Sequence, residues 1–176
     1  EYFRKGAELG DPPAAFNIGV AYLDGVGVIR DQRQGVTWLT RSADAGHAPA
    51  QYYMGLLHQV GEVVPRDDGA AVRRLEQAAA QGYAPAMNDL CTLAFLNKAG
   101  LSLEVAMEPA WLSAGMSGKQ SACLYVAAIR ALRGIGASPD PDLGVSLLRE
   151  SAELGYHYAE SDLGQLYLLG RYVPQD

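Results

Sequence analysis

A spacing of 36 residues runs through the whole chain and limits it to one kind of architecture. Glycines close equivalent segments at intervals of 36, 36, 36 and 37 residues, at Gly10, Gly46, Gly82, Gly118 and Gly155. A second set of small residues keeps the same intervals, at Gly19, Gly55, Cys91, Ala127 and Gly164. Self-similarity at a fixed period of this length indicates a repeat protein, in which each unit buries its apolar face against its neighbours.

The same period sets the expected domain organisation. No Ser/Gly-rich linker, charge block or low-complexity segment interrupts the repeats, so we expect a single repeat domain over residues 1–176. Because the chain opens and closes inside a unit, we also expect it to be part of a longer chain. The expected divisions are a partial repeat at 1–10, repeats at 11–46, 47–82, 83–118 and 119–155, and a partial repeat at 156–176.

Composition argues against two classes of partner. Hydrophobic residues make up 49% of the 176 residues, which is enough for a continuous core. The net charge is −6 and the 14 basic residues are scattered, whereas nucleic-acid binders gain affinity from clustered Lys and Arg. No apolar run approaches the roughly 20 residues that span a bilayer. We therefore predict no nucleic-acid partner and no membrane insertion.

In register, each unit reads as two helices joined by a turn. Apolar residues at Ala14, Ile18, Ala21 and Tyr22 follow the spacing of one helix face, which predicts a first helix. Glycine inside a helix costs about 1 kcal/mol relative to alanine, so the small residue repeated there indicates close packing between helices. The predicted second helix runs through 36–43 and recurs at 72–79 and 145–152.

The turn between the two helices is almost the same in four units. Its first Gly can take the left-handed backbone conformation at a helix end. An Asp six residues later can cap the next helix by accepting hydrogen bonds from free N–H groups. We expect this arrangement at Gly25 and Asp31, Gly61 and Asp67, Gly134 and Asp140, and Gly170 and Asp176.

The third unit departs from this pattern. It has no Gly-x-Gly turn after Phe95, and Leu103 stands where the period predicts the capping Asp. Pro109 falls where a regular second helix would be under way, which indicates a late start or a kink. Two interpretations stay open, namely tolerated drift in a middle unit or a bend shaped for a partner.

The two cysteines are too few for a disulfide framework. Cys123 lies four residues before Ala127, the position taken as equivalent to Cys91. On neighbouring helices this offset is roughly 6 Å along the axis, in addition to about 8–10 Å between axes. The sum exceeds the roughly 7 Å between Cα atoms that a disulfide tolerates. We therefore predict two buried free thiols, which leaves the redox compartment open.

The sequence contains no complete catalytic or metal-binding motif. Residues 118–121 resemble the end of a phosphate-binding loop, but Ser113 stands at the first glycine position and Gln120 follows the Lys. Residues 140–144 carry two carboxylates without the ligand series of a calcium loop. The three histidines have no metal-ligand spacing. We predict a non-enzymatic protein with no cofactor, no metal and no small-molecule substrate.

The repeated motif resembles that of a known family. Its parts are Ile-Gly or Met-Gly, an aromatic residue, Gly-x-Gly-Val-x-x-Asp, Trp-Leu and Ala-x-x-Gly. This combination resembles the Sel-one-like repeat family, which is related to tetratricopeptide repeats, and the resemblance covers essentially the whole chain. It implies an all-α fold, a right-handed α-solenoid of stacked helix-turn-helix repeats of about 36 residues. The first helices are then expected to line a concave face.

The resemblance also selects candidate partner-binding residues. Tetratricopeptide relatives present side chains toward the concave face at fixed offsets from the small residue of the first helix. Two interpretations stay open for these positions, packing within the repeats or contact with a partner. The offsets select Phe16, Val20, Leu23, Tyr52, Leu56, Gln59, Asn88, Thr92, Phe95, Leu124, Ala128, Ala131, Ser161, Gln165 and Leu168.

These observations lead to a functional hypothesis and two rivals. We predict a scaffold or adaptor that binds another protein or peptide along its concave helix face, of bacterial origin. Its compartment is open between cytoplasm and periplasm or export, with a slight preference for the periplasm. The alternative is an immunity or inhibitor protein that neutralises a secreted effector enzyme. A hydrolase or transferase with a scattered active site is the third hypothesis.

Overall fold

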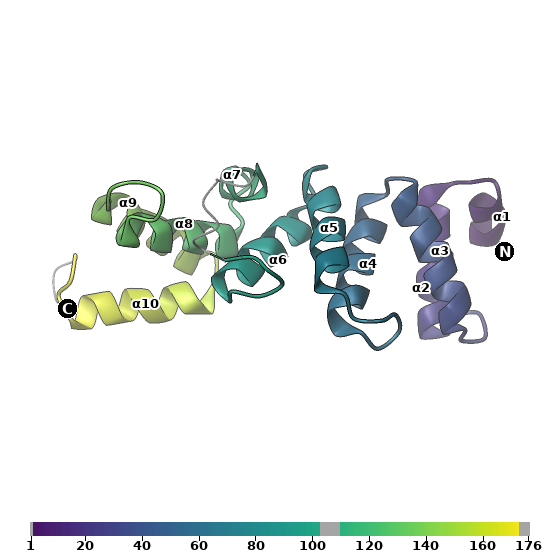
Figure 1. Cartoon of the computed structure of the whole chain (residues 1–176). Coiled ribbons are helices and arrows are strands. Elements are labelled where there is room, and N and C mark those ends of the chain that lie inside the picture. Colours follow the sequence, from purple (N-terminus) through teal and green to yellow (C-terminus); the bar gives the residue numbers. More distant parts are fainter. Residues whose placement is uncertain (1, 103–109, 173–176) are drawn as a thin grey trace. The chain divides into compact units, whose positions relative to one another are not determined.

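The computed structural model describes residues 2–102 and 110–172, and within these ranges every regular element is an α-helix (Figure 1). By its internal contacts the chain divides into two compact units, Glu1–Ala86 and Met87–Asp176, which we call unit 1 and unit 2. The prediction of an all-α chain built from helix-turn-helix repeats is confirmed.

Unit 1 is formed by two helical hairpins and a preceding short helix. Within the first hairpin α2 packs along α3, and within the second α4 packs along α5, while α3 also packs against α4. The helix α6 (Ala84–Phe95) begins in unit 1 and continues into unit 2. The bounds are α1 (Tyr2–Glu8), α2 (Pro12–Asp24), α3 (Gln32–Asp44), α4 (Ala48–Val60) and α5 (Asp68–Ala79).

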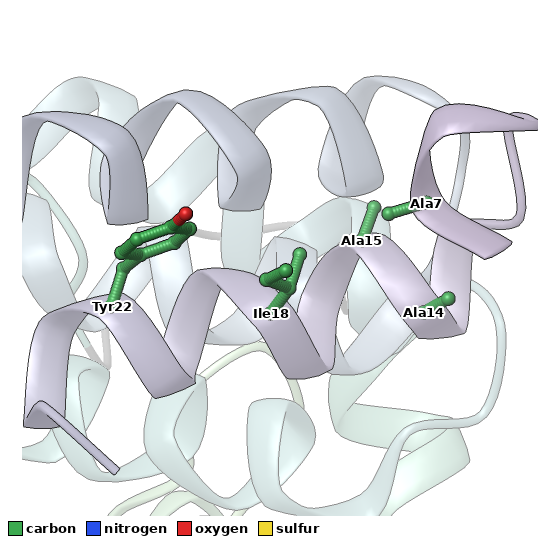
Figure 2. Close-up of a cluster of buried hydrophobic side chains, with 5 residues drawn as sticks. All are labelled: Ala7, Ala14, Ala15, Ile18 and Tyr22. Atoms are coloured by element: carbon green, nitrogen blue, oxygen red, sulfur yellow. The ribbon is translucent and has the colours of Figure 1, made fainter. Parts of the chain in front are cut away.

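The core of unit 1 follows the helix spacing seen in the sequence. Ala15, Ile18 and Tyr22 project from one side of α2, and Ala7 of α1 lies next to Ala15 (Figure 2). A second cluster, from α2, α3 and α4, contains Leu23, Leu39, Ala43, Ala50 and Met54. Each helix therefore buries its apolar stripe against the helices before and after it, as a repeat protein requires.

Capping aspartates start the second helices, as the sequence predicts. The carboxylate of Asp31 accepts a hydrogen bond from Gln34 N at 3.0 Å, and that of Asp67 accepts one from Ala70 N at 2.8 Å. In unit 2, Asp140 accepts one from Leu143 N at 3.0 Å. Asp176 lies outside the described residues. The preceding turn begins with a left-handed glycine at Gly25, Gly61 and Gly134, with φ of 74°, 75° and 69°.

The glycines in the middle of α2 and α4 mark the expected close contacts. A Cβ on Gly19 would lie 2.8 Å from Leu39 Cγ and 3.1 Å from the Gly35 carbonyl oxygen of α3. A Cβ on Gly55 would lie 3.1 Å from Leu75 Cγ and 3.2 Å from the Ala71 carbonyl oxygen of α5. The glycine thus lets the two helices of a hairpin approach more closely than any side chain would allow.

Unit 2 contains the hairpin of the fourth repeat and, among the described residues, parts of the hairpin of the third repeat. Helix α8 packs along α9, and α10 packs on α9. The described second helix of the third repeat, α7, spans 8 residues, whereas α3 and α5 span 13 and 12. Leu103 and Pro109, on which the expected late start or kink depends, lie outside the described residues. The bounds are α7 (Ala110–Ser117), α8 (Ser121–Arg133), α9 (Pro141–Glu153) and α10 (His157–Leu168).

The sequence register predicted for the fourth repeat is wrong by one residue. The left-handed position before each first helix is held by Gly10, Gly46, Gly82 and Gly155, but in the fourth repeat it is held by Lys119, with φ of 53°. The 37-residue interval therefore separates Gly82 from Lys119, and the interval from Lys119 to Gly155 has the regular 36 residues. Since Gly144 faces the Ala128 carbonyl as Gly35 faces that of Gly19, Ala128 rather than Ala127 is the equivalent of Gly19.

The prediction of two free thiols is also wrong. Cys91 of α6 and Cys123 of α8 form a disulfide, with their Cα atoms 5.0 Å apart. The estimate treated successive first helices as level, but the start of α8 lies beside the middle of α6. Asn88 Oδ1, for example, accepts a hydrogen bond from Ala122 N at 3.1 Å. This stagger cancels the axial offset, and the small side chains allow the two backbones to approach.

Candidate functional site

The first row of candidate residues, three positions before the mid-helix small residue, packs between repeats. The Phe16 ring lies 5.4 Å from the His47 ring, and the Tyr52 ring lies 5.3 Å from the Tyr83 ring. Asn88 makes the hydrogen bond to Ala122 N described above. Each side chain thus contacts the start of the next first helix. Packing between repeats accounts for Phe16, Tyr52 and Asn88, whereas Ser161 in the same row of α10 is exposed.

Leu124 belongs to this row only in the uncorrected register. With the register moved by one residue, Tyr125 takes the position equivalent to Phe16 and Tyr52. Leu124 is 3% exposed and Tyr125 is 2% exposed, so neither presents a surface. In the same way, Ala128 and Ala131 give way to Ile129 and Leu132. The sequence carries one signal for the shift, the 37-residue interval, but does not say in which repeat the extra residue lies.

The other two rows differ in exposure along the chain. Leu23 is buried in the core of unit 1, and Val20 is half-buried against the same core. Leu56 and Gln59 of α4 are half-buried, as are Thr92 and Phe95 of α6. On α10, Ser161, Gln165 and Leu168 are exposed. Neutral side chains with accessible surface therefore remain on α2 and α4 in unit 1 and on α10 in unit 2.

An aromatic cluster fills the space between α6, α8 and α10 in unit 2. We use this name for Phe95, Tyr125, Tyr156 and Tyr158. Tyr125 lies at its centre, with ring centroids 4.8 Å from Phe95 and 5.2 Å from Tyr156. Phe95 and Tyr158 are 5.1 Å apart. Of these four, only Phe95 stands at a predicted partner-binding position, because the one-residue shift hid Tyr125 and the other two stand at the start of α10.

The hydroxyl groups of Tyr125 and Tyr156 have raised pKa values. Tyr125 Oη donates a hydrogen bond to Asp162 Oδ2 at 2.8 Å. Burial, together with the Asp162 carboxylate, raises the pKa of Tyr125 far above its usual range. Burial also raises the pKa of Tyr156, against a smaller opposing effect of the Thr92 side chain. Both phenols pack in the cluster, and of the two only Tyr125 donates a hydrogen bond among the described residues.

Unit 1 has a hollow of about 440 Å³ beside the turn between α2 and α3. Arg4 Nη2 donates to Tyr22 Oη at 2.8 Å, and Arg30 Nε donates to the Leu23 carbonyl oxygen at 2.9 Å. Since Asp31 caps α3, each of these charged groups has a structural hydrogen bond. The hollow is lined by Arg4, Tyr22, Val28, Ile29, Arg30, Asp31 and Gln34.

The described residues contain neither a metal-ligand cluster nor a helix that could span a membrane. Over 2–102 and 110–172, no three or more His, Cys, Asp or Glu side chains gather in a way that could hold a metal ion. Over the same ranges, no helix has both the length and the apolar character needed to cross a bilayer.

The chain matches the family model described as the Sel1 repeat. The matched ranges are residues 1–11, 12–47, 48–83, 120–156 and 157–176. They leave out residues 84–119, which contain the third repeat, whose sequence departs from the pattern. No curated protein matches the chain.

Solved structures share its fold. One is a protective antigen present in uropathogenic Escherichia coli strains that displays an SLR fold, with 26% identity over 99% of this chain and a TM-score of 0.82. The chain spans only 37% of that antigen. Another is a Sel1 repeat protein from Oxalobacter formigenes, with 24% identity, a TM-score of 0.75, and coverage of 99% of this chain and 70% of that one.

Proposed function

Because the chain belongs to the Sel1 repeat family, whose members generally mediate protein–protein interaction as non-enzymatic scaffolds, we propose that it is an adaptor. It binds a partner protein or peptide along its first helices. The observation that supports this proposal is the accessible surface left on neutral side chains of α2 and α4, after packing between repeats is accounted for.

In unit 1 the proposed contact surface consists of Val20, Tyr52, Leu56 and Gln59, which we call the first-helix surface. All four side chains are half-buried, so each combines a fixed position with accessible area. None carries a charge, which suits an apolar or neutral segment such as an amphipathic helix or an extended peptide. A fixed aromatic such as Tyr52 is a frequent energetic centre of protein interfaces.

The remaining candidate residues divide into contact and support. Gln165 and Leu168 of α10 are exposed and extend the contact surface in unit 2, together with the half-buried Thr92 and Phe95. We assign a supporting role to Leu23, Asn88 and Leu124, because these side chains are used in packing, and a double role to Phe16 and Tyr52, whose half-buried rings pack on His47 and Tyr83. Substitution of Gln165, Leu168 or Thr92 should affect binding without unfolding the protein. Substitution of a supporting residue, or of Phe95 in the aromatic cluster, should also affect folding.

The test is a binding measurement with a matched pair of variants. Partners are captured from extracts of the source organism on the immobilised chain, and the partner recovered is then purified for direct titration. The surface variant carries Leu56→Ser and Gln59→Ala. The control carries Arg73→Ala and Glu76→Ala, which are exposed on the second helix α5. Circular dichroism verifies that both variants keep their helical content.

We expect the surface variant to raise the dissociation constant at least tenfold and the control variant to leave it unchanged. Equal binding by the wild type and the surface variant would overturn the proposed location. An equal loss of binding in both variants would show that the partner does not bind specifically along the first helices.

The immunity alternative stays a hypothesis, and the same capture separates it from a general adaptor. A toxic enzyme recovered as the single partner, bound one to one and inhibited by the chain, favours immunity. Several partners, or a structural protein, favour the adaptor. A small molecule that raises the melting temperature in a ligand screen would instead favour the hypothesis of a scattered active site.

A further inference from the structure

Three departures from the repeat pattern meet at one place in unit 2. At each of the three positions, the residue type differs from the residues at the equivalent positions of the repeats in unit 1. Two of the departures introduce a larger side chain, and the third removes one. Cys91 takes the position of Gly19 and Gly55, Cys123 takes that of Ala14 and Ala50, and Gly115 takes that of Ser42 and Ala78.

The three residues fit one another in space. Cys91 and Cys123 are bonded, and both are 0% exposed. Cys123 Sγ lies 3.4 Å from the Met87 carbonyl oxygen of α6. A Cβ on Gly115 of α7 would overlap Cys123 Sγ. The loss of a side chain at 115 therefore makes the room that the larger side chain at 123 requires.

The disulfide lies where the regular repeat features are weakest. The third repeat lacks the Gly-x-Gly turn, and the family model does not match residues 84–119. Its described second helix has 8 residues, compared with 12 in α5. The bond joins the first helix of this repeat to the first helix of the next. It thus supplies a covalent connection at the repeat whose sequence departs from the pattern.

We propose that Cys91–Cys123 is a structural disulfide, introduced by a thiol–disulfide oxidoreductase in an oxidising compartment before α6 and α8 pack together. Disulfides form and persist in such compartments and are rare in reducing ones. The matched change at Gly115 indicates that the fold accommodates the bonded sulfurs specifically. This inference does not depend on which partner the protein binds.

The reaction is an exchange with a disulfide of the oxidoreductase. One cysteine loses its proton, and the thiolate attacks that disulfide, which gives a mixed disulfide and releases one sulfur of the enzyme. The second cysteine, also deprotonated, attacks the first cysteine sulfur and releases the other enzyme sulfur. The two electrons and the two protons lost by the cysteines end on the enzyme, which leaves as a dithiol.

Burial sets the order of events. Because both cysteines are 0% exposed, neither an oxidant nor a reductant can reach the sulfurs in the folded unit. The bond must therefore be made before the helices pack, or during an opening of unit 2. For the same reason, the folded protein should resist reduction until unit 2 opens.

The first experiment measures the oxidation state directly. The 176-residue chain is produced with export to a bacterial periplasm, and its thiols are counted by maleimide labelling in denaturant. The folded protein is then incubated with a phosphine reductant, with and without urea. We expect no free thiols, at least tenfold slower reduction without urea, and two free thiols after reduction in urea. Two free thiols in the exported protein, or equal reduction rates, would overturn the proposal.

The second experiment asks whether the bond holds α6 on α8. Hydrogen exchange is compared between the wild type and the double variant Cys91→Ala/Cys123→Ala, which leaves no unpaired thiol. Amides of α6 beyond Met87 and of α8 should exchange at least tenfold faster in the variant, while those of α2 and α4 keep their rates. Unchanged exchange in α6 and α8 would show that the bond is not a structural connection.

A third comparison tests the matched change at Gly115. Gly115→Ala should lower the oxidised fraction or accelerate exchange in α8 in the wild type, and its effect should be smaller in the double-alanine variant, which loses the sulfur but keeps the Cβ of residue 123, 2.9 Å from the added Cβ. Gly164→Ala is the matched control, because no heavy atom lies within 4 Å of its added Cβ among the described residues. Equal effects of Gly115→Ala in both backgrounds would contradict the argument that Gly115 makes room for the disulfide.

Discussion

Unit 1 and unit 2 follow one sequence period but hold their first helices in place by different contacts. In unit 1, Gly19 and Gly55 let each hairpin close tightly, and aliphatic side chains fill the space between hairpins. In unit 2, the Cys91–Cys123 disulfide and the aromatic cluster connect α6, α8 and α10. The period therefore determines where helices occur, and several kinds of contact can hold them there.

The capping of the second helices is the same in both units. Helix formation therefore follows the same local rules in both units, whereas helix packing differs. Asp31, Asp67 and Asp140 each cap a second helix through the N–H three residues later. These bonds depend only on neighbouring residues. The differences arise where residues far apart in the sequence meet. Substitutions at such meeting points should therefore affect the two units unequally.

The largest expected difference concerns the mid-helix glycines. Gly55→Leu should lower the free energy of unfolding by about 2–3 kcal/mol, because the new side chain overpacks against Leu75 and the Ala71 carbonyl. Gly164→Leu is the equivalent change in α10, where no heavy atom lies within 4 Å of an added Cβ among the described residues. It should be neutral or slightly stabilising, because leucine favours the helix. Urea unfolding of both variants measures the difference.

A Gly55→Leu variant that unfolds at the same urea concentration as the wild type would contradict the close contact between α4 and α5. A Gly164→Leu variant as unstable as Gly55→Leu would show that the free face of α10 is covered in solution. Either result would mean that the mid-helix glycines of the two units have more similar surroundings than the structure shows.

The aromatic cluster should give an effect of intermediate size. Tyr125→Phe removes the hydrogen bond to Asp162 and should lower the free energy of unfolding by about 1–2 kcal/mol, because it leaves a partly buried carboxylate without its donor. Tyr158→Phe in the same cluster serves as the control and should change stability by less. Thermal unfolding of both variants measures the effect. Equal effects would mean that ring packing alone, without the Asp162 bond, holds Tyr125.

The left-handed residue before α8 offers a stabilising change. Lys119 has φ of 53°, where the other repeats have glycine. Lys119→Gly should raise the free energy of unfolding by about 0.5–1 kcal/mol, because glycine adopts this conformation without a steric penalty. The Lys119–Glu150 ion pair is lost, but it is exposed and contributes little. Lys119→Ala, which loses the pair and keeps a Cβ, should show no gain in melting temperature.

The smallest expected effect is a pH dependence in unit 1. Burial lowers the pKa of His47 below its usual value of 6.5, against an opposing effect of Asp11. As the pH falls, His47 therefore binds a proton in the unfolded chain before it does so in the folded protein. Its contribution to the free energy of unfolding is full above pH 6.5 and is lost as the pH falls below that value. His47→Gln should therefore lose less stability between pH 7.5 and 5.5 than the wild type. Identical pH profiles from urea unfolding would contradict the shift.

Much of the fold could be predicted from the sequence because its signals are local. The positions of the hairpins, the capping aspartates and the left-handed glycines all follow from residues within one repeat. The mid-helix contacts at Gly19 and Gly55 were also predictable, since only close packing explains a repeated glycine inside a helix. The departure of the third repeat was visible in the missing turn after Phe95.

The candidate site was less predictable, because its residues act through the neighbouring repeat. Phe16, Tyr52 and Asn88 stand at positions that suit a binding face, yet each packs on the start of the next first helix. Tyr125 was missed because a single extra residue before Lys119 shifts every later position. An interval of 37 residues gives the number of insertions but not their place, which depends on the backbone conformation at Lys119.

The sequence by itself determined that this protein is a chain of helical hairpins with caps and turns at fixed intervals. These properties depend on hydrogen bonds and side-chain spacing over a few residues, and such interactions repeat whenever the residues do. Only the tertiary structure decided that Cys91 meets Cys123 and that Tyr125 meets Asp162. Both contacts depend on the stagger between successive first helices, and that stagger comes from the packing of whole side-chain surfaces.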